Sequence, residues 1–183
     1  DMTPANLVDC VDFRYIEDFL SREEALEILK KGKASQPERE KEIRSKGYPA
    51  YITSVGWLGY DDSKIERLCK EGLEQGWDWF KMKVGSNLDD DRRRAAVIRQ
   101  VIGPERQLMM DANQKWSVPE AMAWMEDLAE FRPLWIEEPT SPDDVLGHAA
   151  IARAVSPIGV ATGEQCANRV VFKQLLQAEA IAF

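Results

Sequence analysis

Two lysines and three carboxylates occur at intervals that could support proton transfer beside a metal ion. Lys81 and Lys83 stand two residues apart in the run Phe-Lys-Met-Lys-Val. Counted from Lys83, the acids Asp111, Glu137 and Glu164 follow at steps of 28, 26 and 27 residues. One strand-plus-helix unit occupies about that length, so these residues are predicted at equivalent positions on successive parallel strands.

The lysine pair predicts polar side chains where a buried sheet normally carries apolar ones. Because side chains alternate across a strand, Lys81 and Lys83 are predicted to project to one side and Met82 to the other. In a closed parallel barrel, branched apolar residues fill the inward positions, so two inward lysines near the strand's end indicate an active site. The alternative is an edge strand with a solvated basic face.

The three carboxylates predict a site for a hard divalent cation. Converging carboxylates repel one another, and a cation between them lowers the cost of ionising all three. Asp111, Glu137 and Glu164 would supply only oxygen ligands, which suits Mg²⁺ better than zinc or copper. Taken singly, each acid could instead be a helix cap or a loop charge, and the common spacing is what favours metal binding.

The surrounding sequence predicts the elements that would position these residues. From about residue 50 onward, short apolar runs alternate with amphipathic stretches, the pattern of βα units that feed a parallel sheet. Strands are predicted at residues 50–54, 80–84, 107–111, 134–137, 159–161 and 180–183, with five helices between them. The predicted fold class is α/β, a (β/α)8 TIM-type barrel that is incomplete and has about six βα units over residues 50–183.

Residues 1–49 break this rhythm. Ser21 and Glu24 have capping-box spacing and predict one helix, while the stretch from Gly32 to Gly47 is highly charged and has no apolar period. We interpret residues 1–49 as a connector, or the end of a capping domain, with one helix. Six strands cannot close a barrel of eight, so we expect a segment of a longer protein with at least two further βα units.

Composition and charge argue against two classes of binding partner, nucleic acids and membranes. A formal net charge of −8 argues against nucleic acid, which proteins bind through clustered Lys and Arg. Three arginines at 92–94 directly follow three aspartates at 89–91, an order that predicts a solvated helix face. No apolar run approaches the roughly 18 residues of a membrane-spanning helix, so no membrane partner is expected.

The cysteines and the single histidine are predicted to be structural. Cys10, Cys69 and Cys166 are odd in number and lack metal-ligand spacing, which favours a reducing compartment: the cytoplasm, or the mitochondrial matrix in a eukaryote. Cys69 falls on an apolar helix stripe and is predicted to be core. Cys166 could pack or could lie near the site. His148, in a predicted helix, is expected in a packing or solvent role.

A barrel with Lys-x-Lys on its second strand and Asp, Glu and Glu on the next three resembles the mandelate racemase-like branch of the enolase superfamily. The resemblance implies that Lys83 is the base that removes the proton α to a substrate carboxylate. It implies that Lys81 holds that carboxylate, and that Asp111, Glu137 and Glu164 bind Mg²⁺. A cation and an ammonium group at the carboxylate oxygens would stabilise the negative charge that develops there.

Within that branch, three stretches resemble the L-fuconate dehydratases. They are PAYITSVGWLGY at 49–60, IEEPTSPDD at 136–144 and TGEQCANRVVFKQLLQA at 162–178. The resemblance implies dehydration of the acid sugar L-fuconate to 2-keto-3-deoxy-L-fuconate through an enediolate. It places Asn113 at a substrate-contacting position and lets the loop of Trp57 shape the pocket, although packing is an equal alternative for Trp57.

The resemblance also implies parts beyond this chain. The branch's general acid, an Asp on strand six paired with a His on strand seven, is expected after Phe183, so the chain alone is predicted to be inactive. We expect the whole protein to be a homo-oligomer that binds a small-molecule acid sugar. The alternatives are another acid-sugar dehydratase or a racemase of the same branch, such as one for galactonate or rhamnonate, and a barrel that has lost catalysis.

Overall fold

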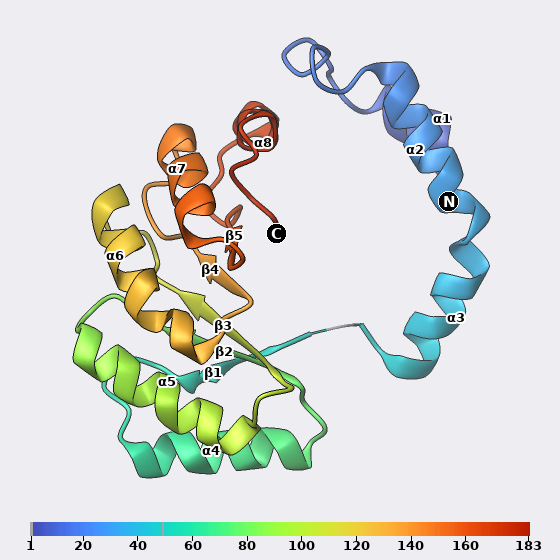
Figure 1. Ribbon diagram of the computed structural model, residues 1–183. Coiled ribbons are helices and arrows are strands. Elements are labelled where there is room, and N and C mark those ends of the chain that lie inside the picture. The colour runs from blue at the N-terminus through green and yellow to red at the C-terminus, as the bar shows by residue number, and fades with distance from the viewer. Residues whose placement is uncertain (1, 49) are drawn as a thin grey trace. The chain divides into compact units, whose positions relative to one another are not determined.

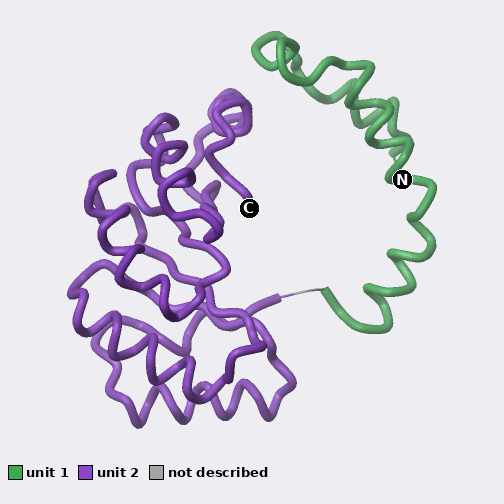
Figure 2. The backbone as a smooth tube through the Cα atoms, viewed as in Figure 1, with its two compact units in different colours: residues 1–49 green, residues 50–183 purple. Residues whose placement is uncertain are grey.

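A computed structural model describes residues 2–48 and 50–183. Asp1 and Pro49, which bound the predicted N-terminal segment, lie outside the described residues. The chain divides into two compact units, residues 1–49 and 50–183, which Figure 2 colours separately.

Residues 2–48 form three helices where one was expected: α1 (Pro4–Asp9), α2 (Arg22–Ala34) and α3 (Gln36–Lys46). The predicted capping box begins α2, because the Glu24 amide donates to Ser21 Oγ at 3.2 Å and the Ser21 amide donates to Glu24 Oε2 at 2.8 Å. The extra helix α3 forms without a buried face. Ion pairs one turn apart support it, since Arg44 pairs with Glu40 at 2.7 Å.

Residues 50–183 alternate strands and helices in chain order, as Figure 1 shows. The five strands of this range are β1 (Ile52–Gly56), β2 (Trp79–Lys83), β3 (Gln107–Asp111), β4 (Trp135–Glu137) and β5 (Gly159–Ala161). Its five α-helices are α4 (Asp62–Glu74), α5 (Leu88–Ile102), α6 (Val118–Leu128), α7 (Val145–Val155) and α8 (Arg169–Gln177), with a short 3₁₀ turn, η1 (Ala129–Phe131), after α6.

The sheet is parallel throughout and keeps the order β1-β2-β3-β4-β5. Its register aligns Lys83 with Asp111, Asp111 with Glu137 and Glu137 with Ala161. One row across the carboxyl edge of the sheet therefore contains the lysine and two of the three acids. In the fourth strand pair the row reaches Ala161 and not Glu164.

The two faces of the sheet have different neighbours. Alternate strand residues such as Phe80, Met82 and Met110 are fully buried in one apolar core with helix residues such as Ile98. Figure 1 shows the helices on that side of the sheet. The opposite face carries a smaller cluster, centred on Trp135. Period-2 alternation therefore sends Lys81 and Lys83 to the face that the helices do not cover.

The predicted sixth strand at 180–183 is wrong. Ala182 and Phe183 both donate their amides to one carbonyl, Val160 O, at 2.8 and 3.3 Å, and no strand is present at these residues. A ladder needs successive donors and acceptors, and two bonds to a single oxygen do not make one. The five strands of residues 50–183 thus form an open part of a (β/α)8-type fold, which closes with eight.

Candidate active site

Four of the predicted residues meet at the carboxyl ends of β2, β3 and β4. Lys83 Nζ lies 2.6 Å from Asp111 Oδ2. Lys81 Nζ lies 3.0 Å from the same oxygen and 2.7 Å from Glu137 Oε2. Two ammonium groups and two carboxylates therefore alternate along the sheet edge, and their formal charges cancel.

Lys81 is enclosed by its partners. It is 5% exposed, and its ammonium also lies 5.3 Å from the centre of the Tyr51 ring. Burial opposes charge on Lys81, but hydrogen bonds from its ammonium to Glu137 and Asp111 and their negative charges outweigh it, so the pKa of Lys81 is raised above its ordinary value. Lys81 is thereby held as a fixed positive charge.

The two carboxylates are oriented by neighbouring groups as well. Asp111 is fully buried, and its Oδ1 accepts the Asn113 amide at 3.0 Å while its Oδ2 faces both lysines. Glu137 Oε2 also accepts the Trp135 indole N–H at 3.4 Å. Charge-assisted hydrogen bonds of this kind fix the direction of carboxylate oxygens.

Glu164 is not part of this group. It is exposed in the turn that follows β5, because the strand ends at Ala161 and the backbone leaves the sheet before residue 164. Among the described residues, no group of three His, Cys, Asp or Glu side chains is close enough to hold a metal ion. Asp111 and Glu137 present only hard oxygen donors, and that donor set fits Mg²⁺.

A cavity of about 420 Å³ opens beside this cluster, and Trp57, Lys83 and Asn113 all line it. Trp57 is 49% exposed and its indole N–H donates to Thr53 O at 3.0 Å, which ties the ring to β1. Asn113 is exposed and has a φ of 45°, a left-handed conformation that Asn tolerates. The structure thus places Trp57 and Asn113, both predicted to contact substrate, in the same cavity lining as Lys83. Lys115 also lines the cavity and was not predicted.

The expectation of a solvated face on the aspartate-arginine run is wrong for two of its residues. Asp91 and Arg94 are both fully buried and pair with each other. A readable signal existed, because residue 91 shares the three- and four-residue spacing of the buried Ala95, Ile98 and Ile102. In the sequence, the runs of three aspartates and three arginines made this line of buried positions hard to recognise.

The other singled-out side chains have packing roles. Cys69 is fully buried, and burial raises the pKa of its thiol to about 12. Cys166 is partly exposed and packs against an apolar cluster that contains Leu175. His148 is fully buried in α7, with Nδ1 2.9 Å from Asp144 O. In the described residues, none of these three side chains forms a hydrogen bond with the lysine-carboxylate cluster of Lys81, Lys83, Asp111 and Glu137.

Comparison with known proteins now gives the family. Residues 64–183 match the protein family described as Enolase C-terminal domain-like. The chain belongs to the enolase superfamily. This assignment agrees with the βα order of residues 50–183 and with lysines and acids at the carboxyl edge of the sheet.

Two curated relatives within the enolase superfamily match the chain over nearly its whole length. Mitochondrial enolase superfamily member 1 from Homo sapiens is 62% identical over 100% of this chain and 42% of the relative. L-galactonate dehydratase from Hypocrea jecorina is 50% identical over 99% of this chain and 41% of the relative. The chain therefore spans less than half the length of these relatives.

Solved structures of superfamily members agree with the fold. The crystal structure of the human mitochondrial enolase superfamily member 1 has a TM-score of 0.95 at 61% identity, covering 99% of this chain and 42% of that one. The L-talarate/galactarate dehydratase of Salmonella typhimurium, liganded with Mg and L-lyxarohydroxamate, has a TM-score of 0.67 at 34% identity, over 72% of this chain and 34% of that one. Relatives of this chain thus include named sugar-acid dehydratases and a magnesium-bound structure.

Proposed function

We propose that this chain supplies the proton-abstracting part of an acid-sugar dehydratase. One observation carries the proposal: Lys81, Lys83, Asp111 and Glu137 meet within hydrogen-bonding distance at the carboxyl edge of the sheet, beside a cavity. Parallel α/β barrels place their active sites at that edge. Burying charged side chains there costs folding stability, so the presence of four of them supports a functional role.

The two lysines have different surroundings, and this supports different roles. Lys83 has a side chain 23% exposed and lines the cavity, so its Nζ can reach a bound substrate and accept the proton from carbon 2. Lys81 is buried as a fixed cation and can hold the substrate carboxylate. Removal of the carbon 2 proton makes an enediolate, whose added charge Lys81 would stabilise.

Asp111, Glu137 and Glu164 are the residues we propose for Mg²⁺. The hard oxygen donors of Asp111 and Glu137 on adjacent strands support this set, and Glu164 would join them from the turn after β5. A bound cation would supply positive charge at the substrate carboxylate oxygens.

The dehydration then needs a proton for the leaving hydroxyl. The bond between carbon 3 and its oxygen breaks, the hydroxyl takes a proton and leaves as water, and the remaining enol becomes the 2-keto-3-deoxy acid. The single histidine of the chain is buried in α7, so we propose an Asp-His pair on further strands as the acid. The activity is accordingly proposed for a longer protein that contains this chain.

For the substrate we propose a six-carbon acid sugar of L-galacto configuration. L-fuconate and L-galactonate share that configuration at carbons 2 and 3, where the reaction occurs, and differ only at carbon 6, which carries a hydroxyl in L-galactonate alone. The fungal relative at 50% identity is named for L-galactonate, which supports this stereochemistry. Trp57 and Asn113 are the proposed contacts along the sugar chain.

The proposal is tested by the whole protein on a panel of acid sugars with Mg²⁺. Turnover of L-fuconate or L-galactonate to a 2-keto-3-deoxy acid is expected. Lys83→Met should abolish both turnover and exchange of the carbon 2 proton with D₂O, while Lys70→Met, an exposed control on α4, should keep both. Turnover of rhamnonate alone would refute the substrate, inversion without water loss would identify a racemase, and binding without turnover would identify a non-catalytic barrel.

We also propose a cellular compartment and an oligomeric state for the whole protein. No helix in the described residues has the length and apolar character to cross a membrane. Three free cysteines and a human relative named mitochondrial support the cytoplasm or the mitochondrial matrix as the compartment. We also propose that the whole protein is a homo-oligomer, which light scattering on the purified protein would test.

A further inference from the structure

We propose that the buried pair Asp91–Arg94 of α5 is a positioning device for Lys83, acting through the backbone on both sides of that lysine. This inference rests on the proposed function of Lys83 as the base. Both side chains of the pair are 0% exposed. Their hydrogen bonds go to the backbone at Lys83 and Gly85, so both are positioning residues and not catalytic ones.

The pair binds the backbone where β2 ends. Arg94 Nη1 donates to Lys83 O at 2.8 Å and to Gly56 O at 2.9 Å. Asp91 Oδ2 accepts the Gly85 amide at 2.7 Å. Helix α5 therefore holds three backbone groups: the Lys83 carbonyl, the Gly85 amide and the Gly56 carbonyl at the end of β1.

Arg94 supplies these bonds where the strand ladder itself is irregular. The pairing of β1 with β2 shifts register between Ile52 and Gly56, so the two strand ends do not continue a regular ladder. A guanidinium with five N–H donors can bridge two carbonyls that lie on different strands. It thereby fixes where the Cα of Lys83 lies relative to β1.

The pair is itself held by neighbours on several elements. The Trp124 indole N–H of α6 donates to Asp91 Oδ2 at 3.1 Å, and Arg94 Nε donates to Asp90 Oδ2 at 2.7 Å. Each polar end of the pair thus has partners, which a buried charge requires. Charge-assisted bonds in a closed environment restrict motion of the backbone they hold.

Stability alone does not explain a buried pair at this place. A buried ion pair contributes little net stability, and apolar residues of similar volume often replace it without loss. Placing the base accurately is a different requirement, because a displacement of about 1 Å in a catalytic group can lower the rate about 100-fold. Lys83 has a long side chain that is 23% exposed, so its reach depends on where its backbone is anchored.

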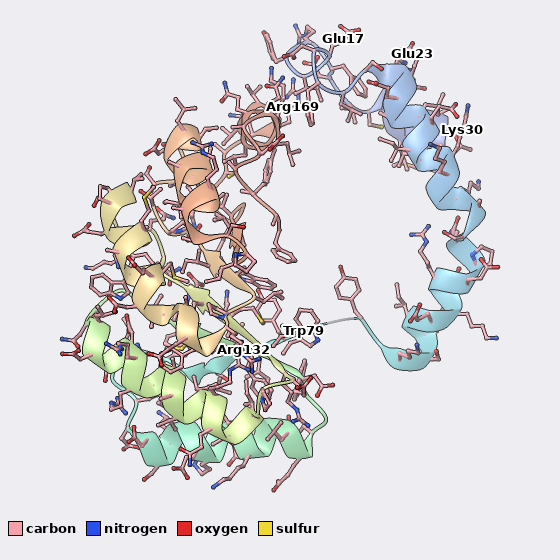
Figure 3. The ribbon with its side chains drawn as sticks, viewed as in Figure 1. Glu17, Glu23, Lys30, Trp79, Arg132 and Arg169 are labelled. Carbon is pink, nitrogen blue, oxygen red and sulfur yellow. The ribbon has the colours of Figure 1, made fainter. Side chains whose placement is uncertain are left out.

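The same helix offers a matched control. Arg99 of α5 is partly buried and, like Arg94, binds backbone carbonyls, donating to Phe131 O and Arg106 O at 2.8 Å. These carbonyls precede β4 and β3, at the amino ends of the strands. Figure 3 labels two residues at this end, Trp79, the first residue of β2, and Arg132, which lies between η1 and β4. Arg99 therefore repeats the chemistry of Arg94 at the end of the sheet away from Lys83.

The test compares Arg94→Met and Arg99→Met in the whole protein with Mg²⁺. Arg94→Met should lower kcat about 10- to 100-fold while KM changes less than about 3-fold, because the base is displaced and the substrate carboxylate clamp at Lys81 is kept. Amide hydrogen exchange at residues 84–86 should become faster in the same variant. Arg99→Met should leave kcat and the exchange at 84–86 at wild-type values, even where its melting temperature falls equally.

Arg94→Lys keeps the charge and one or two donors, so partial recovery of kcat is expected, and this variant serves if Arg94→Met does not fold. Equal kcat losses in the Arg94 and Arg99 variants, or unchanged exchange at residues 84–86, would overturn the positioning role. A wild-type protein without turnover on any acid sugar would instead refute the proposed function. The amide-exchange comparison still decides the backbone effect in that case.

Discussion

Lys81 and Lys83 have different surroundings, which supports the different roles proposed for them. Lys81 lies between Asp111 and Glu137 and is 5% exposed, whereas Lys83 forms an ion pair with Asp111 and lines the cavity. Two neighbouring anions keep the Lys81 ammonium charged, whereas the side chain of Lys83 lines the cavity. These different neighbours support the proposal that Lys81 is the clamp and Lys83 the base.

At this scale we predict the effect of removing the enclosed cation. Lys81→Met leaves the buried Asp111 and the partly buried Glu137 close together with one fewer positive charge, so the fold should lose about 3 kcal/mol of unfolding free energy. Urea unfolding measures this loss. Mg²⁺ should restore more stability to the variant than it adds to the wild type, because a divalent cation replaces the missing charge.

Lys70→Met is the matched control, since Lys70 pairs with Glu66 at 3.3 Å on the exposed side of α4. Its loss should cost less than about 1 kcal/mol and should not depend on Mg²⁺. If the Lys81 and Lys70 variants lost equal stability, the lysine-carboxylate cluster would not be the coupled buried group described above.

At the scale of elements, the helices position the site by packing closely on the strands. Helix α4 crosses β1 and β2 at Gly72, where an added Cβ would lie 2.7 Å from Ile52 Cδ1 and 2.9 Å from Phe80 Cε1. Such separations are shorter than carbon atoms tolerate. The absence of a side chain at Gly72 therefore sets how near α4 comes to the strand that carries the lysines.

We predict that Gly72→Ala destabilises the protein by about 1 to 3 kcal/mol, because overpacking outweighs the helix propensity that alanine adds. Thermal unfolding followed by circular dichroism measures the change. The control Lys70→Ala adds helix propensity to the same helix at an exposed position and should be within about 1 kcal/mol of wild type. A gain of stability in Gly72→Ala would contradict the close approach.

At the scale of the whole molecule, residues 50–183 form a sheet with two unpaired edges. In the described chain, β1 pairs only with β2 and β5 pairs only with β4. On the face opposite the helices, Trp79 is 42% exposed and Phe183 is 54% exposed. An eight-stranded barrel pairs every edge and covers that inner face, and the five strands here do neither.

We therefore predict that the 183 residues alone do not dehydrate L-fuconate or L-galactonate and that they bind an apolar fluorescent dye. The whole protein should show turnover and much weaker dye fluorescence, because its remaining strands would cover the inner face. Dye fluorescence and a 2-keto acid assay on both samples make the comparison. Dehydration by the 183 residues alone would contradict the expectation that the acid lies on further strands.

The sequence by itself determined the type and order of the first five strands and of the five helices in residues 50–183, as well as the shared row of Lys83, Asp111 and Glu137. These are local properties: side-chain alternation repeats every two residues, and each βα unit has nearly constant length. Strands β3 and β5 lie at their predicted residues, and every predicted helix of this range is present. The lysine pair and two acids could thus be placed from spacing alone.

Only the tertiary structure decided the rest. Equal spacing predicted Glu164 in the row, yet β5 ends at Ala161 and Glu164 lies in the turn beyond it, because strand length depends on the neighbouring strand. Asp91 and Arg94 looked solvated in a run of charges, and they are buried because irregular strand ends beside α5 need hydrogen-bond donors and acceptors. Hydrogen-bond partners of this kind come from segments distant in sequence, so local sequence patterns could not predict which charged residues are buried.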